Sequence, residues 1–522
     1  MKRVILIITL LSILLPIALD ARDGGDVIWS YYADVENPWD WHHIRSIKNI
    51  ADVNGDGHED ALAVSENDTL YCLSGEAGDV IWTFTADPCF ITRGLTSVPD
   101  LDNDGISDVM LGTIWGTKKV FAISGATGGI IWQYDTHEYG TGGWIYEVAP
   151  MSDMDGDGIT DILASAGGDA YRAYLFSGAT GTKIWEYSPG PYAVFGIREA
   201  GDLNGDSNPD VVITTGNYVA SAFRTIALNG SDGSELWNVG LTSTGWTVTP
   251  IGDIDSDDVN DVAVGTMDGK VIAFSGDDGT VIWTRNIGGT VVDLYPLPDI
   301  NEDGIPELLP SGTGMSSFYC IDGLTGNVIW STSAADQVFT SVAIPDISGD
   351  GIWDVVGGTG FSSCVFYAMD GLSGDNLWTK NMSSSVESAW WIEDIDNNGS
   401  SDILVGLRDG WIYALADGNP VGVDDTIETQ EELRLYQNYP NPFNTSTLIS
   451  YNLATNRHEL TRIKIYNVKG QVVKQFSIVN NKLSIEWDGK DESGSSVLNG
   501  IYFYQIEANN FKSKIKKMVL IR

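Results

Sequence analysis

A short carboxylate-rich loop carries the clearest chemical signal in the sequence. Residues 153–161 read Asp-Met-Asp-Gly-Asp-Gly-Ile-Thr-Asp, with carboxylates at loop positions 1, 3, 5 and 9 and glycine at position 6. Calcium binds about six to eight oxygen atoms at about 2.3 to 2.6 Å, and such a loop can wrap around the ion. Position 7 would add a main-chain carbonyl, and the glycine permits the sharp turn. The loop therefore predicts a calcium site.

The loop occurs eight times, and its copies begin 46 to 53 residues apart. Loops two and three carry every carboxylate, whereas loop one has Asn54 at position 3. Loops four and five lack the glycine, loop six ends in Glu307, loop seven has Ser348 at position 3, and loop eight has Asn398 at position 5. We expect calcium (Ca2+) in up to eight loops, first in loops one to three and next in loops four and five. The predicted ligands, in loop order, are Asp52, Asn54, Asp56 and Asp60; Asp100, Asp102, Asp104 and Asp108; Asp153, Asp155, Asp157 and Asp161; Asp202, Asn204, Asp206 and Asp210; Asp253, Asp255, Asp257 and Asp261; Asp299, Asn301, Asp303 and Glu307; Asp346, Ser348, Asp350 and Asp354; Asp394, Asp396, Asn398 and Asp402.

Other interpretations of these loops fit less well. An EF-hand needs a bidentate Glu at position 12 and flanking helices, and a dockerin also needs a helix after the loop, but strand-like Val/Ile/Leu-rich segments follow at once. Plain acidic turns remain the alternative, because Asp and Gly favour turns. The formal net charge of −43 argues against nucleic acid as a partner. Eight calcium ions would contribute 16 positive charges and reduce the net charge to −27.

The segments around each loop predict four short β-strands per repeat. One apolar segment precedes the loop, one follows it, a third ends at a Ser-Gly or Asp-Gly turn, and a fourth ends in Trp. The eighth repeat lacks its last strand, but residues 25–29, Gly-Asp-Val-Ile-Trp, supply one at the start of the chain. Closing a ring in this way removes exposed sheet edges. We therefore predict an all-β fold with an eight-bladed β-propeller over residues 25–418, closed by its N-terminal strand, in which one Trp of each repeat packs between blades.

The repeats resemble two known families. Their Asp-x-Asp-x-Asp-Gly-x-x-Asp loops are similar to the FG-GAP or VCBS repeats of integrin-type propellers, and their Ser-Gly-x-x-Gly-x-x-x-Trp endings are similar to pyrroloquinoline-quinone-type (PQQ-like) propeller repeats. The resemblance covers about three quarters of the chain. It implies a propeller fold and leaves the ligand open.

The N-terminus has the layout of a signal peptide over residues 1–21. A basic start precedes an apolar run over residues 4–19, and Ala21 offers a cleavage point; an uncleaved anchor helix is the alternative. No later segment is long and apolar enough to span a bilayer, so the processed chain is not expected to be transmembrane. The four cysteines fit no metal motif. If two of them pair, Cys320 with Cys364 is the expected disulfide; otherwise they are buried small hydrophobes.

A second unit is predicted after the repeats. Residues 419–432 contain Pro, Gly and then acidic residues and are typical of a linker. Residues 433–522 carry 13 Lys or Arg against 6 Asp or Glu, and they alternate polar and apolar residues between turns. This pattern predicts a small Ig-like β-sandwich.

Four motifs in this unit resemble the type A sorting domain of the type IX secretion system. They are Tyr-Pro-Asn-Pro-Phe-Asn at 439–444, Tyr-Asn-Val-Lys-Gly-Gln at 466–471, Gly-Ile-Tyr at 500–502 and Lys-Lys-Met-Val-Leu at 516–520. The unit is also similar to the Ig-like domain of flagellar hook-capping proteins (FlgD Ig-like). The resemblance implies recognition by the type IX machinery and a bacterial product that is secreted or attached to the outer-membrane surface. A plain Ig-like module is the alternative.

The sequence favours a binding or adhesion scaffold for a glycan or protein over an enzyme. It contains only five His and lacks a Gly-x-Ser-x-Gly elbow and metalloprotease spacing. A polysaccharide lyase is the alternative, because known eight-bladed calcium propellers that this chain resembles include such enzymes. It would need a cluster of basic residues or His, for which the candidates are Arg93, Arg172, Arg198 and Arg224, and no rule brings these together. Aromatic residues expected on the face opposite the acidic loops offer a stacking platform or blade packing. This predicted ligand face comprises Trp39, Trp41, His42, His43, Phe90, Trp115, Tyr139, Trp144 and Tyr192.

Overall fold

The computed structural model divides the chain into two compact units, Met1–Gly422 and Val423–Arg522, which are described separately. It describes residues 22–33, 42–87, 89, 92–217 and 220–418 of the first unit, and residues 434–435, 438, 441, 443, 446–452, 462–477, 484–508, 511–513 and 515–520 of the second. The predicted signal peptide 1–21, the linker 419–432, most of the 439–444 motif, and Trp39, Trp41 and Phe90 lie outside the described residues. In these described ranges no helix is long and apolar enough to cross a membrane.

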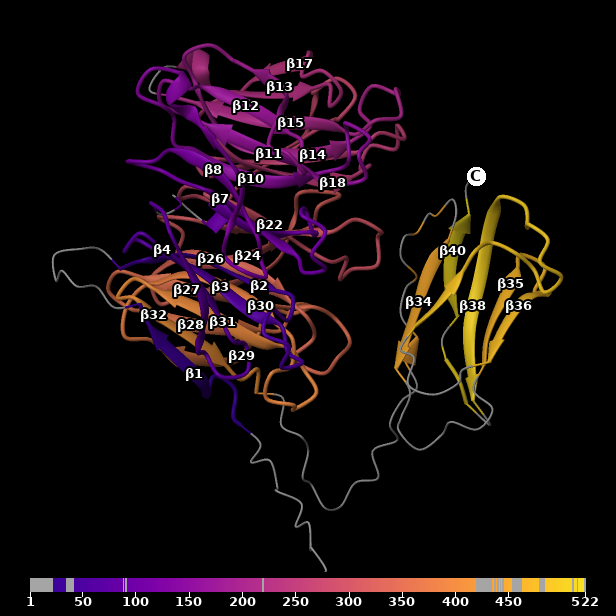
Figure 1. Cartoon of the computed structure of the whole chain (residues 1–522). Helices are drawn as coiled ribbons and strands as arrows, with labels where there is room; N and C mark the ends of the chain where they lie inside the picture. The colour runs from indigo at the N-terminus through magenta and orange to yellow at the C-terminus, as the bar shows by residue number, and fades with distance from the viewer. Residues whose placement is uncertain are drawn as a thin grey trace, which may run out of the picture. The chain divides into compact units, whose positions relative to one another are not determined.

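The described strands of the first unit form eight four-stranded antiparallel sheets, which are numbered here after the acidic loop that each contains (Figure 1). In every sheet the acidic loop joins the first and second strands of the repeat. Sheets 1 to 4 comprise β2 (Ile44–Ile50), β3 (Asp60–Ser65), β4 (Thr69–Leu73) and β5 (Val80–Thr85); β6 (Leu95–Val98), β7 (Asp108–Gly112), β8 (Lys119–Ile123) and β9 (Ile130–Asp135); β10 (Ile145–Met151), β11 (Asp161–Ala166), β12 (Arg172–Phe176) and β13 (Lys183–Tyr187); β14 (Ala193–Gly201), β15 (Asp210–Gly216), β16 (Arg224–Leu228) and β17 (Glu235–Gly240).

Sheets 5 to 8 continue the same order. They comprise β18 (Gly245–Gly252), β19 (Asp261–Thr266), β20 (Lys270–Phe274) and β21 (Val281–Asn286); β22 (Asp293–Leu297), β23 (Glu307–Ser311), β24 (Ser317–Ile321) and β25 (Val328–Ser333); β26 (Gln337–Ile344), β27 (Asp354–Gly360), β28 (Val365–Met369) and β29 (Asn376–Asn381); β30 (Val386–Ile392), β31 (Asp402–Leu407), β32 (Trp411–Leu415) and β1 (Val27–Tyr32). Short 3-10 turns lie at η1 (Thr92–Gly94), η2 (Thr136–Glu138) and η3 (Ala220–Ala222).

The N-terminal strand β1 completes sheet 8, as the sequence predicted. It pairs antiparallel with β32, placing Val27 opposite Leu415 and Trp29 opposite Ala414. The first strands of successive sheets contact one another around the unit, and β2 of sheet 1 contacts β30 of sheet 8. Ser388 Oγ of β30 donates to the Ile44 carbonyl of β2 at 2.9 Å. The sheets therefore form a closed ring, and the all-β propeller prediction is confirmed.

A tryptophan on the fourth strand of each sheet ties that sheet to the next. Trp132 Nε1 of β9 donates to the Gly178 carbonyl of sheet 3 at 2.6 Å, and its ring lies against Gly181, where a Cβ would come within 2.6 Å. Trp29, Trp82, Trp185, Trp237, Trp283 and Trp330 repeat this hydrogen bond, and Trp378 donates to the Asp417 carbonyl. The predicted packing of the repeated Trp between blades is confirmed.

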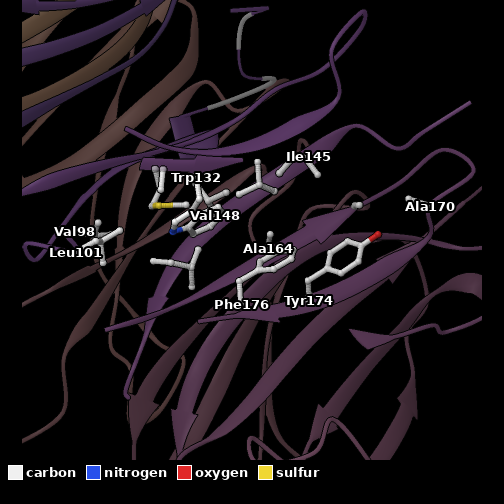
Figure 2. Close-up of a cluster of buried hydrophobic side chains, with 14 residues drawn as sticks. Val98, Leu101, Trp132, Ile145, Val148, Ala164, Ala170, Tyr174 and Phe176 are labelled. Atoms are coloured by element: carbon white, nitrogen blue, oxygen red, sulfur yellow. The ribbon is translucent and has the colours of Figure 1, made fainter. Parts of the chain in front are cut away.

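Apolar clusters fill the spaces between neighbouring sheets. Figure 2 shows the cluster between sheets 2 and 3, which contains Trp132, Val148, Phe176 and Tyr174. The Trp132 and Phe176 ring centroids are 5.9 Å apart. The strands rich in Val, Ile and Leu are buried on both faces, because each sheet is covered by a neighbouring sheet on either side. The cores therefore hold the sheets, and so the loops that connect their strands, in fixed positions.

The expected disulfide does not form, because all four cysteines are free thiols. Cys320 is buried on β24 in the cluster between sheets 6 and 7, whereas Cys364 precedes β28 and is half-buried. Cys72 occupies the same repeat position as Cys320, opposite the Trp of its own sheet. Cys72, Cys89 and Cys320 are buried and therefore serve as small hydrophobic core residues.

The second unit has two antiparallel sheets. One contains β33 (Arg434–Leu435), β34 (Thr447–Asn452) and β37 (Ser484–Trp487); the other contains β35 (Arg462–Asn467), β36 (Val472–Ser477), β38 (Gly500–Ala508), β39 (Phe511–Lys512) and β40 (Lys516–Leu520). Trp487 of the first sheet and Tyr504 and Ile465 of the second share one buried cluster. The unit is therefore the predicted β-sandwich.

Candidate functional site

All eight acidic loops share one backbone conformation. Residues at positions 4 and 6 have a left-handed φ in every loop, from 61° to 104°. The position 1 carboxylate accepts a hydrogen bond from the position 6 N–H in each loop, for example from Gly158 to Asp153 at 2.8 Å. Glycine at position 6 was predicted for the sharp turn, but the left-handed residue at position 4 was not. The carboxylates thus point inward even in the loops that depart from the consensus.

Loops four and five hold a non-glycine residue in the left-handed conformation at position 6. Ser207 has φ 73° and Asp258 has φ 70°, which costs about 1 kcal/mol for a side-chain-bearing residue. We expect Ser207→Gly to raise the free energy of unfolding by about 1 kcal/mol. Gly158→Ser should lower it by about as much, because a Cβ there meets no atom within 4 Å and only the φ opposes it. Denaturant titrations in EDTA check both; equal stability of the two variants would contradict the prediction.

The position 9 carboxylate joins each loop to the rest of its sheet. Asp161 is fully buried; its Oδ2 accepts from the Met154 N–H at 2.7 Å and its Oδ1 from the Gly178 N–H at 3.0 Å. Gly178 also accepts the hydrogen bond from Trp132, so a chain of contacts runs from the loop to the neighbouring sheet. Burial raises the pKa of Asp161 to about 6. Asp60, Asp108, Asp210, Asp261 and Asp354 bind the corresponding glycine in the same way.

Four loops bring three carboxylates together closely enough to share one ion. One oxygen from each of positions 1, 3 and 9 lies within 4.8 Å of the others in loops two, three, five and eight, the groups of this kind among the described residues. Two oxygens that each lie about 2.5 Å from calcium can be at most about 5 Å apart, so these sets fit the ion. Without a cation, such carboxylates repel one another.

Hydrogen bonds within three other loops occupy the same space. Asn204 Nδ2 donates to both oxygens of Asp210 in loop four. Asn54 Nδ2 donates to Asp56 at 2.7 Å in loop one, and Ser348 Oγ donates to Asp346 in loop seven. An ion in these loops would require the polar side chain at position 3 to turn its oxygen inward. The loops that group three carboxylates are therefore loops two, three, five and eight, whereas the sequence favoured loops one to three.

Loops six and eight each leave a buried carboxylate oxygen without a hydrogen-bond partner in the described part of the chain. These atoms are Glu307 Oε1 and Asp402 Oδ1. In the other six loops the turn glycine donates to this oxygen; in sheet 6 Gly323 makes no such hydrogen bond, and in sheet 8 Asp417 stands where the glycine would be. Burial raises the pKa of Glu307 to about 7. Burial, together with the charges of Asp396 and Asp417, raises the pKa of Asp402 to about 8.

The described residues of the predicted ligand face lie in several different connections between strands. Trp115 is 46% exposed in the β7–β8 connection, with φ 48°. The Tyr139 ring lies 3.9 Å from the Arg172 guanidinium, and Tyr192 OH lies 3.2 Å from Ser221 Oγ. His42 and His43 lie just before β2, where His43 Nδ1 is 3.0 Å from Glu66 Oε2.

Two further aromatic clusters involve residues of the first strands, and the second cluster also includes a residue of a second-to-third-strand loop. Trp144 packs with Tyr146, Phe195 and Trp246, and the Phe195 and Trp246 rings stack at 4.5 Å. Trp144 is thus part of a cluster, as the packing alternative predicted. Phe361, 56% exposed with φ 73°, lies 5.0 Å from Phe339, and the Arg408 guanidinium lies 5.4 Å from both rings. No motif or spacing in the sequence predicted this second cluster.

A charged network crosses the centre of the ring. Arg93, just before β6, donates to Glu147 Oε2 on β10 at 2.7 Å and to the Trp246 carbonyl on β18 at 2.9 Å. Its Nε lies 3.7 Å from Asp293 Oδ1 on β22. Arg198 of β14 also contacts Glu147. Arg93 and Arg198 therefore do converge, and charged residues within otherwise apolar first strands were the signal that sequence reasoning passed over.

Lys48 belongs to the same centre. Its Nζ donates to Tyr295 OH at 2.8 Å and lies 3.3 Å from the centroid of the Trp390 ring. Burial, opposed by Asp293 and aided by Arg198, lowers the pKa of Lys48 from 10.5 to about 7. The amine is therefore poised between its charged and neutral forms at neutral pH.

Lys48 should make the stability of the protein depend on pH. Between pH 7 and 10.5 the unfolded chain keeps the Lys48 proton that the folded chain has lost, so the free energy of unfolding should rise with pH by about 1 kcal/mol per unit. Lys48→Met should remove this slope. Lys119→Met, at a half-exposed lysine beside Asp135, is the control. Urea titrations from pH 7 to 9.5 check it, and an unchanged slope in Lys48→Met would contradict it.

Comparison with known families confirms the resemblances noted in the sequence. Residues 437–521 match the model of a secretion system C-terminal sorting domain. Residues 153–213 match an FG-GAP-like repeat, and residues 221–305 match the model of the outer membrane protein assembly factor BamB, a PQQ-type repeat. The sorting domain directs the chain through the type IX secretion system to the bacterial cell surface or the extracellular space.

Individual proteins are similar over parts of the chain. The human protein FAM234B is 30% identical over 191 residues, which cover 33% of this chain and 29% of the human protein, so the chain spans less than a third of that relative. The crystal structure of Saccharomyces cerevisiae Sqt1 covers 75% of this chain and 99% of its own at 10% identity and a TM-score of 0.56. The computationally designed protein Ika8 covers 76% and 100% at 14% identity and a TM-score of 0.51. These structures share the fold.

Proposed function

We propose that this exported propeller protein is a calcium-stiffened scaffold that binds a glycan or protein ligand outside the bacterial cell. The observation that carries the calcium part is the approach of three carboxylates within 4.8 Å in four of the acidic loops. Asp153, Asp155 and Asp161 would hold the ion in loop three. Bound calcium would neutralise the repulsion among these carboxylates and crosslink the first two strands of the sheet through the loop.

The ligand is proposed to bind on the face opposite the acidic loops. The second-to-third-strand connections on that face present Trp115 and Phe361, which are 46% and 56% exposed and both have a left-handed φ. Such a conformation is costly for an aromatic residue and is often kept at binding sites. Flat aromatic faces stack on sugar rings and anchor protein partners. Arg408 beside Phe361 adds a charged hydrogen-bond donor.

A glycan array and a surface-protein pull-down with the full chain in millimolar calcium test this function. We expect Trp115→Ala or Phe361→Ala to weaken binding by about tenfold or more, as truncation of an aromatic anchor does. Leu372→Ala is the matched control, because Leu372 is 47% exposed in the β28–β29 turn that lies on the face of the acidic loops. Failure to bind any glycan or protein, or loss of binding in Leu372→Ala alone, would contradict the proposal.

A polysaccharide lyase is the second candidate, and the meeting of Arg93, Arg198 and Lys48 at the ring centre favours it. A lyase needs a base to remove the proton next to a uronate carboxylate and cations to hold that carboxylate. Lys48, however, is 6% exposed and Arg93 is 4% exposed, so a polymer has no access to either in this conformation. Ultraviolet absorbance of unsaturated uronate after incubation with pectin would establish lyase activity, and Lys48→Met should then abolish it.

A further inference from the structure

The end of sheet 8 is where the first and last segments of the ring meet. The Gly25 N–H donates to the Ala416 carbonyl at 2.9 Å, and the Ala416 N–H donates to the Asp26 carbonyl at 2.8 Å. Gly418 packs on Gly24 so closely that a Cβ on it would come within 2.1 Å of the Gly24 Cα. Residues 416–418 thus bind the N-terminal segment directly.

Asp417 links this closing segment to loop eight. Its carbonyl accepts the hydrogen bond of Trp378 at 2.5 Å. Its side chain accepts from Asn398 Nδ2 at 2.6 Å and from Ser400 Oγ, at positions 5 and 7 of the loop. Asp417 occupies the position of the turn glycine, which in sheet 2 is Gly125, the acceptor of the Trp82 hydrogen bond. Loop eight therefore has an additional carboxylate beside it.

Loop eight also contains a buried oxygen that lacks a protein partner. Asp402 is fully buried, and its Oδ1 makes no hydrogen bond with the described residues. In six other loops the turn glycine donates to this oxygen, but in sheet 8 Asp417 stands in the place of that glycine. Carboxylate oxygens of Asp394, Asp396 and Asp402 lie within 4.8 Å of one another. A buried carboxyl oxygen without a hydrogen-bond partner is costly, and a cation would satisfy it.

We propose that a calcium ion in loop eight fastens the closure of the ring. Asp394, Asp396 and Asp402 hold the ion, and Asp417 is the additional carboxylate that couples it to the segment that binds the N-terminal strand. This inference rests on the calcium binding proposed above and adds a regulatory role for one loop. Occupancy of loop eight then sets how readily β1 leaves sheet 8.

The physical basis is local opening. Strand β1 is the outermost strand of sheet 8 and pairs only with β32 among the described strands, so it can open without unfolding the ring. Without an ion, repulsion between the loop-eight carboxylates and Asp417 favours this opening, and it is offset only in part by Arg22, whose Nη1 lies 3.9 Å from Asp396 Oδ2. An ion that binds only the closed state suppresses opening by the factor 1 + [Ca]/Kd. At about 2 mM calcium and a Kd of about 0.1 mM this factor is about twenty.

Hydrogen exchange of the full chain, with calcium or with EDTA, tests the proposal. We expect calcium to slow exchange of the Gly25 and Ala416 amides about tenfold to twentyfold. Asp396→Asn, at position 3 of loop eight, and Asp417→Asn should abolish this protection. Asp155→Asn, at position 3 of loop three, is the matched control and should leave it intact.

Counting bound calcium in the same samples distinguishes failure of the proposed calcium binding from failure of the proposed role of loop eight in ring closure. If the wild-type chain binds no calcium, the proposed function fails and this inference fails with it. If Asp396→Asn loses one ion per chain but exchange of the closing amides is the same with and without calcium, only the present proposal is overturned. Unchanged protection in Asp417→Asn would overturn the role of Asp417. Should the loop-eight variants fail to fold, a calcium titration of the wild-type chain decides, because protection of these amides must rise with occupancy.

Discussion

Removal of calcium from the full chain is expected to lower its melting temperature by about 5 to 15 °C. An extracellular calcium site with a Kd of about 0.1 mM adds about 1.8 kcal/mol to stability at about 2 mM calcium. Occupancy of the four converging loops would add about 7 kcal/mol. Each loop joins the first and second strands of a sheet, and in six loops, loop three among them, the position 9 carboxylate binds the turn that accepts the hydrogen bond of the neighbouring Trp. Loss of the ion should therefore weaken contacts between sheets.

Differential scanning calorimetry in calcium and in excess EDTA measures this effect. Asp155→Asn should reduce the difference, whereas Asp375→Asn, at an exposed residue outside the loops, should not. Magnesium should restore little of the stability, because it is smaller and requires near-octahedral geometry. A melt that is the same in calcium and EDTA, with no bound calcium by elemental analysis, would contradict the assignment of the loops.

Substitution of Arg93 by Met is expected to lower the free energy of unfolding by about 3 to 5 kcal/mol. Its side chain is 2% exposed and that of Glu147 is fully buried. Arg93 connects sheet 2 to sheets 3, 5 and 6 through Glu147, Trp246 and Asp293. Removing it leaves two buried carboxylates with less compensating charge and leaves a main-chain carbonyl without this donor. Urea denaturation of the full chain measures the loss.

Arg172→Met provides the matched control for this substitution. Arg172 pairs with Glu186 at 3.2 Å, but both side chains are partly exposed, so its loss should cost at most about 1 kcal/mol. Equal effects of the two substitutions would show that the central network contributes no more than a surface ion pair. A double variant, Arg93→Met with Glu147→Gln, should recover part of the stability, because it removes the uncompensated buried charge as well.

The repeat pattern in the sequence was sufficient to predict the fold. Spacing of the acidic loops, alternation of apolar segments with turns, and one Trp per repeat predicted four-stranded sheets in a ring. The missing eighth strand and the surplus segment before the first repeat predicted the pairing that joins Trp29 to Ala414. These features are local or strictly periodic, so each repeat carries the same information again. The sorting domain was recognisable for the same reason, because its motifs are short and contiguous.

Only the tertiary structure decided which loops bring their carboxylates together and what lies at the centre of the ring. Loop eight departs from the consensus in sequence, yet it groups three carboxylates, while loop one does not. Arg93 and Arg198 showed no relation in sequence, yet both reach Glu147. Cys320 and Cys364 lie in positions that leave both thiols free. The physical reason is distance along the chain: a repeat dictates its own strands and turns, whereas contacts between repeats depend on how the closed ring orients side chains that are about 50 to 200 residues apart.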